Sequence, residues 1–171
     1  NVRGIIELEK GHFAKEIESQ LQQAGYGTVS GVLNATNFGV PQSRSRFFIV
    51  GKKDGNPPPL PSGSCENVVT VADAIADLPA LEMGANIDIL EYRNPPPSDY
   101  AKLLRGSLER CTGHLVSRNS DLVYQRYLHI PQGGNWADIP AHLMENYRDR
   151  TRCHTGIYRR LRWDHPSVVI G

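Results

Sequence analysis

The chain has 171 residues, of which 39% are hydrophobic and 22% are charged, and its formal net charge is +1. This size and composition predict a globular protein of one domain, or one and a half, and exclude an intrinsically disordered chain. No apolar run approaches the length of a membrane span and no leader pattern is present, so we expect a cytoplasmic protein with no membrane partner.

The formal charge is distributed unevenly along the chain. Residues 1–100 contain 8 basic and 12 acidic side chains, whereas residues 101–171 contain 11 basic and 6 acidic side chains. The second part is therefore the better candidate for contact with a polyanion.

Cysteine and histidine show no ligand pattern. Cys65, Cys111 and Cys153 are odd in number and far apart, and the six histidines have no regular spacing. We therefore expect neither a disulfide framework nor a bound metal, and a reducing compartment is the default.

The first predicted element is an amphipathic helix over Gly11–Gly25. Phe13, Ile17, Leu21 and Ala24 recur at spacings of four, four and three, which places them on one stripe that we expect to face the core.

Two strands follow this helix. Tyr26–Leu33 and Arg46–Lys52 carry β-branched and aromatic residues and are expected to pair antiparallel, because consecutive strands usually neighbour each other. The connection, Asn34–Ser45, is long for a hairpin, and long ordered loops tend to be functional.

The rest of the chain is punctuated by Pro and Gly. Residues 54–64 (D-G-N-P-P-P-L-P-S-G-S) are expected to form a linker and the domain boundary. Beyond it, capping residues and breakers predict short elements. These are a helix over Val71–Leu78 capped by Thr70, a helix over Asp99–Arg105 capped by Ser98, a helix from Asn119 or Ser120 to Ile130, a short helix over Ala141–Tyr147 and a terminal strand over Val168–Ile170.

The most informative stretch is Phe38–Gly51, reading F-G-V-P-Q-S-R-S-R-F-F-I-V-G. Because successive side chains of an extended chain point to opposite faces, Arg44 and Arg46 should share one face. Two adjacent guanidinium groups repel each other, so an acidic or carbonyl-rich partner is expected opposite them. The alternative is an edge-strand arginine pair bound to surface carboxylates.

This stretch resembles the Gln-x-Arg-x-Arg block of the DNA cytosine-5 methyltransferases. Asn1-Val2-Arg3-Gly4-Ile5-Ile6 resembles the tail of that family's Glu-Asn-Val-x-Gly block. Residues 130–140 (I-P-Q-G-G-N-W-A-D-I-P) and 158–170 (Y-R-R-L-R-W-D-H-P-S-V-V-I) resemble the end of its target-recognition region. The blocks agree in order and rough spacing, so the resemblance spans nearly the whole chain.

The resemblance implies an α+β fold in two parts. Residues 1–53 would be the terminal helix and β-hairpin of an α/β, Rossmann-like catalytic domain. Residues 65–171 would form a small, irregular target-recognition domain. The chain also begins within a recognisable block, so we expect a fragment or excised domain of a larger bacterial enzyme that is monomeric when complete.

The resemblance also implies chemistry. The complete enzyme would transfer a methyl group from S-adenosylmethionine to carbon 5 of a cytosine flipped out of duplex DNA. Arg46 would contact the cytosine oxygen, and Asn1 would hold a turn. Arg44 would support the pocket, or reach a phosphate or the family's acidic Glu, which is expected outside this chain. None of the three cysteines follows a proline, so the nucleophile and most of the cofactor site are expected outside this chain, which alone should be inactive.

A second informative stretch is the basic segment Arg148–His165, in which Tyr158 and Trp163 lie among six arginines. Arginines with interleaved aromatics are typical of nucleic-acid surfaces, although a solvated arginine face is the simpler alternative. With the resemblance we favour DNA contact, and we expect Trp163 to belong to the core. The predicted DNA-binding residues are Gln42, Arg150, Arg152, His154, Tyr158, Arg159 and Arg160.

Two other functions remain open from the sequence. One is a relative that methylates transfer RNA, against which the long segment between Lys53 and Tyr158 argues. The other is a non-catalytic DNA-binding module or the subunit of a split methyltransferase.

Overall fold

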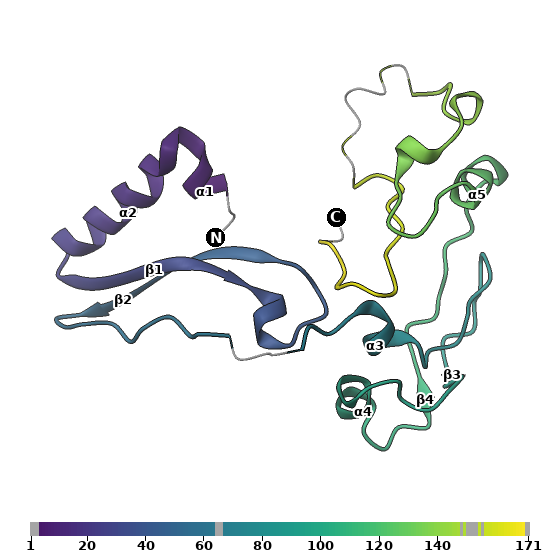
Figure 1. The fold of residues 1–171 in the computed structure, drawn as a ribbon, viewed down its shortest axis with the longest axis horizontal. Helices are drawn as coiled ribbons and strands as arrows, with labels where there is room; N and C mark the ends of the chain where they lie inside the picture. The colour runs from purple at the N-terminus through teal and green to yellow at the C-terminus, as the bar shows by residue number, and fades with distance from the viewer. Residues whose placement is uncertain (1–3, 64–66, 148, 150–153, 155, 170–171) are drawn as a thin grey trace. The chain divides into compact units, whose positions relative to one another are not determined.

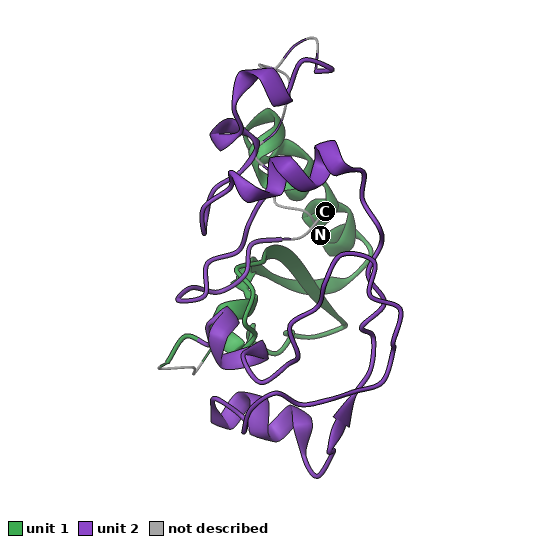
Figure 2. Ribbon diagram, turned by 90° about the vertical axis from the view of Figure 1, so that its right-hand side faces the viewer, with its two compact units in different colours: residues 1–68 green, residues 69–171 purple. Residues whose placement is uncertain are grey.

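The computed structural model describes residues 4–63, 67–147, 149, 154 and 156–169. The chain forms two compact units, Asn1–Val68 and Val69–Gly171, which Figure 2 shows in different colours. Unit 1 contains two helices and a β-hairpin, and unit 2 contains short helices joined by long irregular segments.

Unit 1 begins with a sharp change of direction between helices. α1 (Gly4–Glu7) continues into a single 3₁₀ turn, η1 (Leu8–Gly11), and then into α2 (His12–Gln23). Glu9, Lys10 and Gly11 all have positive φ angles, between 46° and 79°, which separates the axes of α1 and α2. The predicted helix over Gly11–Gly25 is confirmed to within two residues at its ends.

The hairpin is also confirmed. β1 (Tyr26–Asn34) pairs antiparallel with β2 (Ser45–Lys53), and its register places Val29 opposite Val50 and Leu33 opposite Arg46. Residues directly opposite each other share a face of the hairpin. One face therefore carries Gly27, Val29, Gly31 and Leu33 together with Arg46, Phe48, Val50 and Lys52.

The other face of the hairpin lies against α2, which runs alongside it in Figure 1. Phe47, on this face, is only 8% exposed. At the end of the helix, the Gln22 amide donates to the Thr28 hydroxyl at 3.4 Å, and the Lys53 ammonium donates to the Ala24 carbonyl. The apolar and polar contacts together hold α2 on the Phe47 face.

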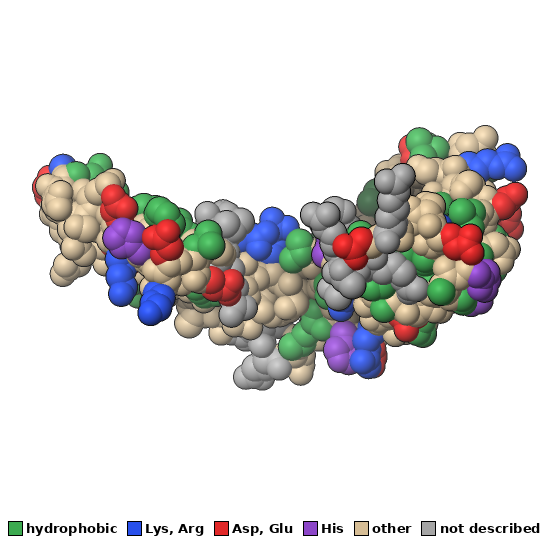
Figure 3. All heavy atoms as spheres, turned by 90° about the horizontal axis from the view of Figure 1, so that it is seen from above, with side chains coloured by type: hydrophobic (Ala, Val, Ile, Leu, Met, Phe, Trp, Pro, Cys, Tyr) green, Lys and Arg blue, Asp and Glu red, His purple; other side chains and the backbone are tan. Residues whose placement is uncertain are grey.

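The predicted inward stripe of α2 is wrong at Phe13, Ile17 and Ala24, which are exposed, and only Leu21 is half-buried. Ala14 is buried, but Phe13 and Ile17 are 44% and 38% exposed. A hairpin of two strands is too narrow to cover a full apolar stripe, which is roughly 100° wide on such a helix. In Figure 3, hydrophobic side chains accordingly appear among charged ones on the outer surface of unit 1.

The Pro- and Gly-rich segment after β2 packs on the hairpin. A Cβ atom on Gly27 would lie 2.2 Å from the Gly55 carbonyl oxygen, and one on Gly31 would lie 2.8 Å from a methyl carbon of Leu60. We call residues 55–61 the strap, because they run across the glycine-bearing face of β1 in close contact. The composition that predicted a linker thus also allows this contact, while the position of a domain boundary stays a prediction.

Unit 2 contains α3 (Val71–Ile75), α4 (Asp99–Arg105) and α5 (Asp121–Leu128), and a two-stranded sheet of β3 (Leu90–Glu91) and β4 (Arg110–Cys111). The predicted caps are confirmed. Thr70, Ser98 and Ser120 each accept a hydrogen bond from the backbone N–H three residues later.

Four boundaries in unit 2 differ from the predictions, and the first is the end of α5, which lies at Leu128 and not Ile130. α3 ends at Ile75 and not Leu78. The segment after Pro140, predicted as a helix over Ala141–Tyr147, forms only the 3₁₀ turn η4 (Ala141–Leu143). Another 3₁₀ turn, η3 (Trp136–Asp138), precedes it. The terminal strand is wrong for Val168 and Val169, which do not lie in a strand, and Ile170 lies outside the described residues. Short local patterns lack the cooperative length that would define such ends.

The core of unit 2 is small. Its buried centre consists of Ile130, Ile139 and Met144, against which Trp136, Leu143, Tyr147 and Tyr158 pack. The expectation that Trp163 belongs to the core is wrong, since this side chain is 44% exposed. The partly buried indole of Trp136, held by the capped η3 turn, packs against the core instead.

A buried arginine ties this core together. Arg126 is only 3% exposed, and its guanidinium donates to the Leu143 carbonyl at 2.7 Å, to the Tyr158 hydroxyl at 2.8 Å and to the Asn146 side chain. These bonds link α5 to two later segments, and they supply the partners that a buried charge requires.

The described part of the chain has no membrane-spanning helix and no metal-binding cluster. Its helices are all too short or too polar to cross a bilayer. The same residues include no group of three His, Cys, Asp or Glu side chains arranged to hold a metal ion. Cys111 is a buried free thiol, and Cys65 and Cys153 lie outside the described residues.

The strap contact generates a first prediction. Gly27→Ala should destabilise unit 1 by about 1–3 kcal/mol, because the new Cβ meets the Gly55 backbone and cannot be relieved by a side-chain rotation. Gly51→Ala is the matched control, since its Cβ would meet Tyr26 at an ordinary 3.4 Å. Thermal and urea unfolding measure both. Equal stability of the two variants would mean that the strap is not seated on β1.

The capping box at Thr70 generates a second prediction. The Thr70 hydroxyl bonds both the Asp73 N–H and the Asp73 carboxylate, and this side-chain bond, with the one from the Thr70 N–H, lowers the pKa of Asp73. Thr70→Val should therefore destabilise unit 2 by about 1 kcal/mol at neutral pH. Thr112→Val, at an exposed position, is the control.

The sign of the pH dependence follows from the lowered pKa. Asp73 stabilises the folded state above the unfolded-state pKa, about 4, and this contribution is lost as pH falls through the folded-state value. The stability difference between wild type and Thr70→Val should thus shrink in acid. A difference that stayed constant from pH 7 to pH 3 in urea unfolding would contradict the role of Asp73.

Candidate functional site

The strap and the hairpin together enclose a groove in unit 1. β2 contributes Arg46, Phe48 and Val50, which alternate on the face toward the strap, and Leu60 and Pro61 of the strap form the facing wall. The cavity has a volume of about 510 Å³. Its lining residues are Leu33, Ala35, Phe38, Arg44, Arg46, Phe48, Val50, Leu60 and Pro61.

Arg44 and Arg46 both line this groove, as the alternation of the sequence predicts. Arg46 is half-buried, and one guanidinium nitrogen donates to the Ser45 carbonyl at 2.9 Å. Neither arginine forms an ion pair within the described ranges, so the alternative of an arginine pair bound to surface carboxylates has no support there. The groove thus combines apolar walls with two positive charges.

The backbone around Arg44 is fixed by a residue that the sequence analysis missed. The Asn34 side chain accepts hydrogen bonds from the backbone N–H of Arg44 at 3.0 Å and of Thr36 at 3.3 Å. It thereby caps the 3₁₀ turn η2 (Ala35–Phe38) and joins the two ends of the long loop. An Asn at a strand end before a turn is the signal that could have identified it.

Of the other residues predicted in and beside this site, Gln42 is described in the structure. Gln42 is half-buried in the loop that leads to β2, and its N–H donates to the Val40 carbonyl at 2.7 Å. Asn1, Arg150 and Arg152 lie outside the described residues.

Four predicted DNA-binding residues lie in unit 2. His154 is exposed, and its Nδ1 accepts from the Gly156 N–H at 3.1 Å. Tyr158 and Arg160 make hydrogen bonds within the unit. The Tyr158 hydroxyl accepts from Arg126, and Arg160 donates to the Ile130 carbonyl at 3.0 Å. Arg159 is exposed and makes no side-chain hydrogen bond or ion pair to any described residue.

Arg162 is neutralised locally. Its guanidinium forms a bidentate pair with Asp164, at 3.0 and 2.7 Å, which raises the pKa of Arg162 and, with a further hydrogen bond from His165, lowers the pKa of Asp164. Among the described arginines of the basic segment, Arg159 therefore has the most available charge. Acidic and basic side chains are interspersed on the face of unit 2 that Figure 3 shows.

A cavity of about 390 Å³ adjoins Arg159. It is lined by Tyr127, Leu128, Ile130, Tyr158, Arg159 and Arg160. Tyr127 and Tyr158 meet edge to face, with ring centroids 5.4 Å apart. The residue missed here is Arg126, whose guanidinium donates to the Tyr158 hydroxyl at 2.8 Å. A single arginine inside a helical segment gives no sequence signal of burial.

Comparison with known proteins identifies the family. The family model of C-5 cytosine-specific DNA methylases matches residues 1–160. The chain is 29% identical to DNA (cytosine-5)-methyltransferase PliMCI of Paracentrotus lividus, over 100% of this chain and 12% of the relative. It is 31% identical to type II methyltransferase M1.HphI of Haemophilus parahaemolyticus, over 99% and 38%, and 31% identical to M.AgeI of Thalassovita gelatinovora, over 99% and 57%.

The chain therefore spans between about an eighth and somewhat over half of the length of these relatives. The family model covers the arginine groove, the strap and nearly all of unit 2. On this match, the chain belongs to the C-5 cytosine-specific DNA methylase family.

Proposed function

We propose that this chain is part of an enzyme that methylates carbon 5 of cytosine in duplex DNA. Residues 1–53 would belong to its α/β, Rossmann-like catalytic domain, and residues 65–171 would be its target-recognition domain. The observation that carries the proposal is the groove of unit 1, in which Arg44 and Arg46 share apolar walls. Family membership supports the same reaction.

The reaction demands a fixed positive charge. Carbon 5 of cytosine is a poor nucleophile, and it becomes reactive when a thiolate bonds to carbon 6 and pushes electron density onto the ring. That density accumulates at the ring nitrogen and at the exocyclic oxygen. A preorganised donor at the oxygen lowers the barrier, because it needs no rearrangement as the charge develops. The methyl group would come from S-adenosylmethionine, to whose binding we assign no residue of this chain.

Arg46 suits the role of that donor. Its bond to the Ser45 carbonyl restrains the guanidinium, and its remaining N–H groups are available for a ligand. Phe48, Val50 and Leu60 surround it with apolar surface, where a hydrogen bond to a charged acceptor is stronger than in water. The groove volume of about 510 Å³ exceeds what one pyrimidine requires. The base would have to leave the helical stack to reach it.

Arg44 has a different position in the groove. It is exposed and lies on the loop that Asn34 holds, one residue before β2 begins. We assign it to the phosphate or sugar next to the flipped base, where an exposed guanidinium neutralises charge. Asn1 and Gln42 would support the same site.

Unit 2 would contact the duplex outside the flipped base. Arg159 is proposed as a phosphate contact because its charge is exposed and unpaired among the described residues. Arg160 would contact phosphate with the N–H groups that its bond to Ile130 leaves over, while His154, Arg150 and Arg152 are assigned to base edges. Tyr158 would line the adjoining surface.

The catalytic proposal is tested at Arg46 in the complete enzyme. Arg46→Ala should lower kcat by about 10²–10³-fold, the usual cost of one donor at a developing oxyanion, with a smaller loss of DNA affinity. Arg46→Lys should restore little, because an ammonium does not reproduce the planar fork. Single-turnover methylation of a duplex with labelled methyl donor measures this.

Lys52→Ala is the matched control, since Lys52 is an exposed cation on the same face of β2. It should keep wild-type turnover. If Arg46→Ala retained wild-type turnover as well, Arg46 would have no catalytic role.

The DNA-contact proposal is tested by the salt dependence of binding. Arg159→Ala should reduce the slope of log K against log salt by about 1, with no change in melting temperature. Arg160→Ala should also lower the melting temperature, because it removes the bond to the Ile130 carbonyl. An unaltered slope in Arg159→Ala would exclude this residue from the interface.

A further inference from the structure

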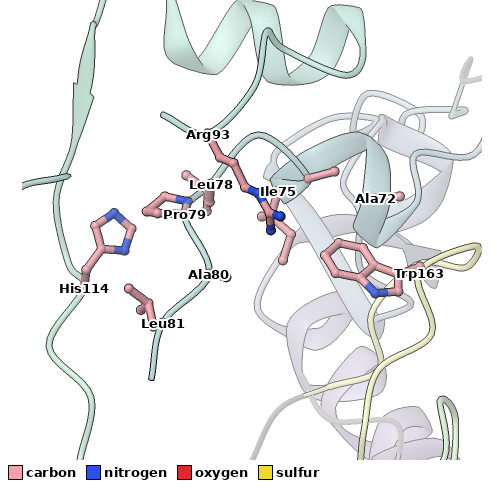
Figure 4. Close-up of a pocket in the computed structure, with 10 residues that line it drawn as sticks. Ala72, Ile75, Leu78, Pro79, Ala80, Leu81, Arg93, His114 and Trp163 are labelled. Carbon is pink, nitrogen blue, oxygen red and sulfur yellow. The ribbon is translucent and has the colours of Figure 1, made fainter. Parts of the chain in front are cut away.

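Unit 2 contains a second cavity, of about 500 Å³, remote in sequence from the arginine groove. α3 and the loop after it form its apolar part, and Arg93, His114 and Trp163 approach it from three other segments (Figure 4). Ile75, Leu78 and Pro79 are among the apolar residues that line it. Neither the methylation chemistry nor the proposed DNA contacts use these residues.

His114 gives this cavity an unsatisfied polar atom. The residue is only 6% exposed, and its Nε2 is buried without a hydrogen-bond partner among the described residues. Its backbone N–H is anchored to the Asp88 carboxylate at 3.3 Å, which holds the imidazole in the cavity wall beside Pro79 and Leu81. A buried polar atom without a partner destabilises the folded state, so such atoms are rare and call for an explanation.

Arg93 adds a positive charge. Its backbone N–H donates to the Asp77 carbonyl at 2.8 Å, and the side chain extends toward the middle of the cavity in Figure 4. The nearby Asp77 carboxylate, 2% exposed, is already paired with Arg105 at 3.4 Å. Within the described ranges the Arg93 guanidinium has no hydrogen bond or ion pair of its own. It is therefore available for an anion.

Trp163 provides a planar apolar surface. Its backbone is held on α3, because the Trp163 carbonyl accepts from the Ala72 N–H at 2.9 Å, and the Trp163 N–H donates to the Gln132 side chain at 3.3 Å. The indole is nevertheless 44% exposed and lines the cavity across from His114. An anchored but uncovered indole is suited to stack on another flat ring.

We propose that this cavity is a binding site for a small aromatic acid. The ring system would lie on Trp163 and the apolar wall of α3, the anionic group would pair with Arg93, and a polar group at the other end would bond to His114 Nε2. The volume is within the range of ligand sites, about 300–1,000 Å³, and a largely apolar lining with few convergent polar groups is typical of them.

The probe for the test is 8-anilinonaphthalene-1-sulfonate, which combines flat rings with one anionic group. The chain has two tryptophans, so the indole N–H signal of Trp163 can be assigned by NMR with Trp163→Phe. Titration of the whole chain should shift this signal. Arg93→Gln should weaken the Kd measured at it by about tenfold or more, the value of a hydrogen bond to a charged group.

Arg110→Gln is the matched control, because Arg110 is an exposed arginine of β4 in the same unit. It should leave the Kd unchanged. A Trp163 signal that does not move, or an equal Kd in Arg93→Gln and wild type, overturns the proposal. Probe bound in the apolar groove of unit 1 would not shift this signal and does not count as support.

His114→Leu gives an independent measurement. Replacing an unpartnered buried imidazole by an apolar side chain should maintain or raise the melting temperature, while the affinity for the probe falls by about tenfold. A clearly lower melting temperature would mean that Nε2 already has a structural partner, and the proposed ligand contact at His114 would be wrong.

Discussion

The arrangement of unit 1 depends on the register of one antiparallel strand pair. With Leu33 opposite Arg46, the residues Arg46, Phe48 and Val50 share a face with Gly27 and Gly31. A shift by one residue would turn Arg46 toward α2 and Phe47 toward the strap. The glycines reinforce the correct register, because only positions without a Cβ atom admit the strap at the distances observed at Gly27 and Gly31. The groove is thus a consequence of strand pairing together with glycine at positions 27 and 31.

Unit 2 is organised differently. Its fully buried hydrophobic centre is small, and polar side chains make the connections between segments that are distant in the chain. Arg126 holds α5 to Leu143 and Tyr158, Arg105 holds α4 to Asp77 and Asn94, and Arg160 holds the last segment to Ile130. Directional bonds of this kind fix irregular segments that lack the regular hydrogen bonding of helices and sheets. Arg159, in contrast, is exposed and makes no side-chain bond to a described residue, and it is one of the arginines proposed to contact DNA.

Both units are small, and this explains why several large side chains are poorly covered. Phe13 and Ile17 on α2, and Trp163 beside α3, are large apolar groups that a small unit leaves exposed. At Trp163 the neighbouring residues add a guanidinium and a buried imidazole nitrogen that have no partner among the residues the structure describes. Exposure of apolar surface alone indicates little. Its combination with convergent polar groups distinguishes the cavity beside Trp163 from the outer face of α2.

Local chemistry in the sequence determined the elements whose signals are short-range. The apolar run Phe47–Val50, the glycine after α2 and the side-chain caps at Thr70, Ser98 and Ser120 act within a few residues. The hairpin and the helix starts could therefore be predicted from the chain alone. The alternation of side chains between the two faces of an extended chain also predicted that Arg44 and Arg46 lie on the same side.

Contacts between residues far apart in the chain were decided only by the tertiary structure. Nothing local indicated that the Pro-rich segment would lie on Gly27 and Gly31, that Arg126 would be buried, or that Trp136 and not Trp163 would enter the core. Each of these outcomes depends on which surfaces meet after the elements form. Burial and close packing arise where elements distant in the sequence come into contact, so the pattern of a single segment does not predict them.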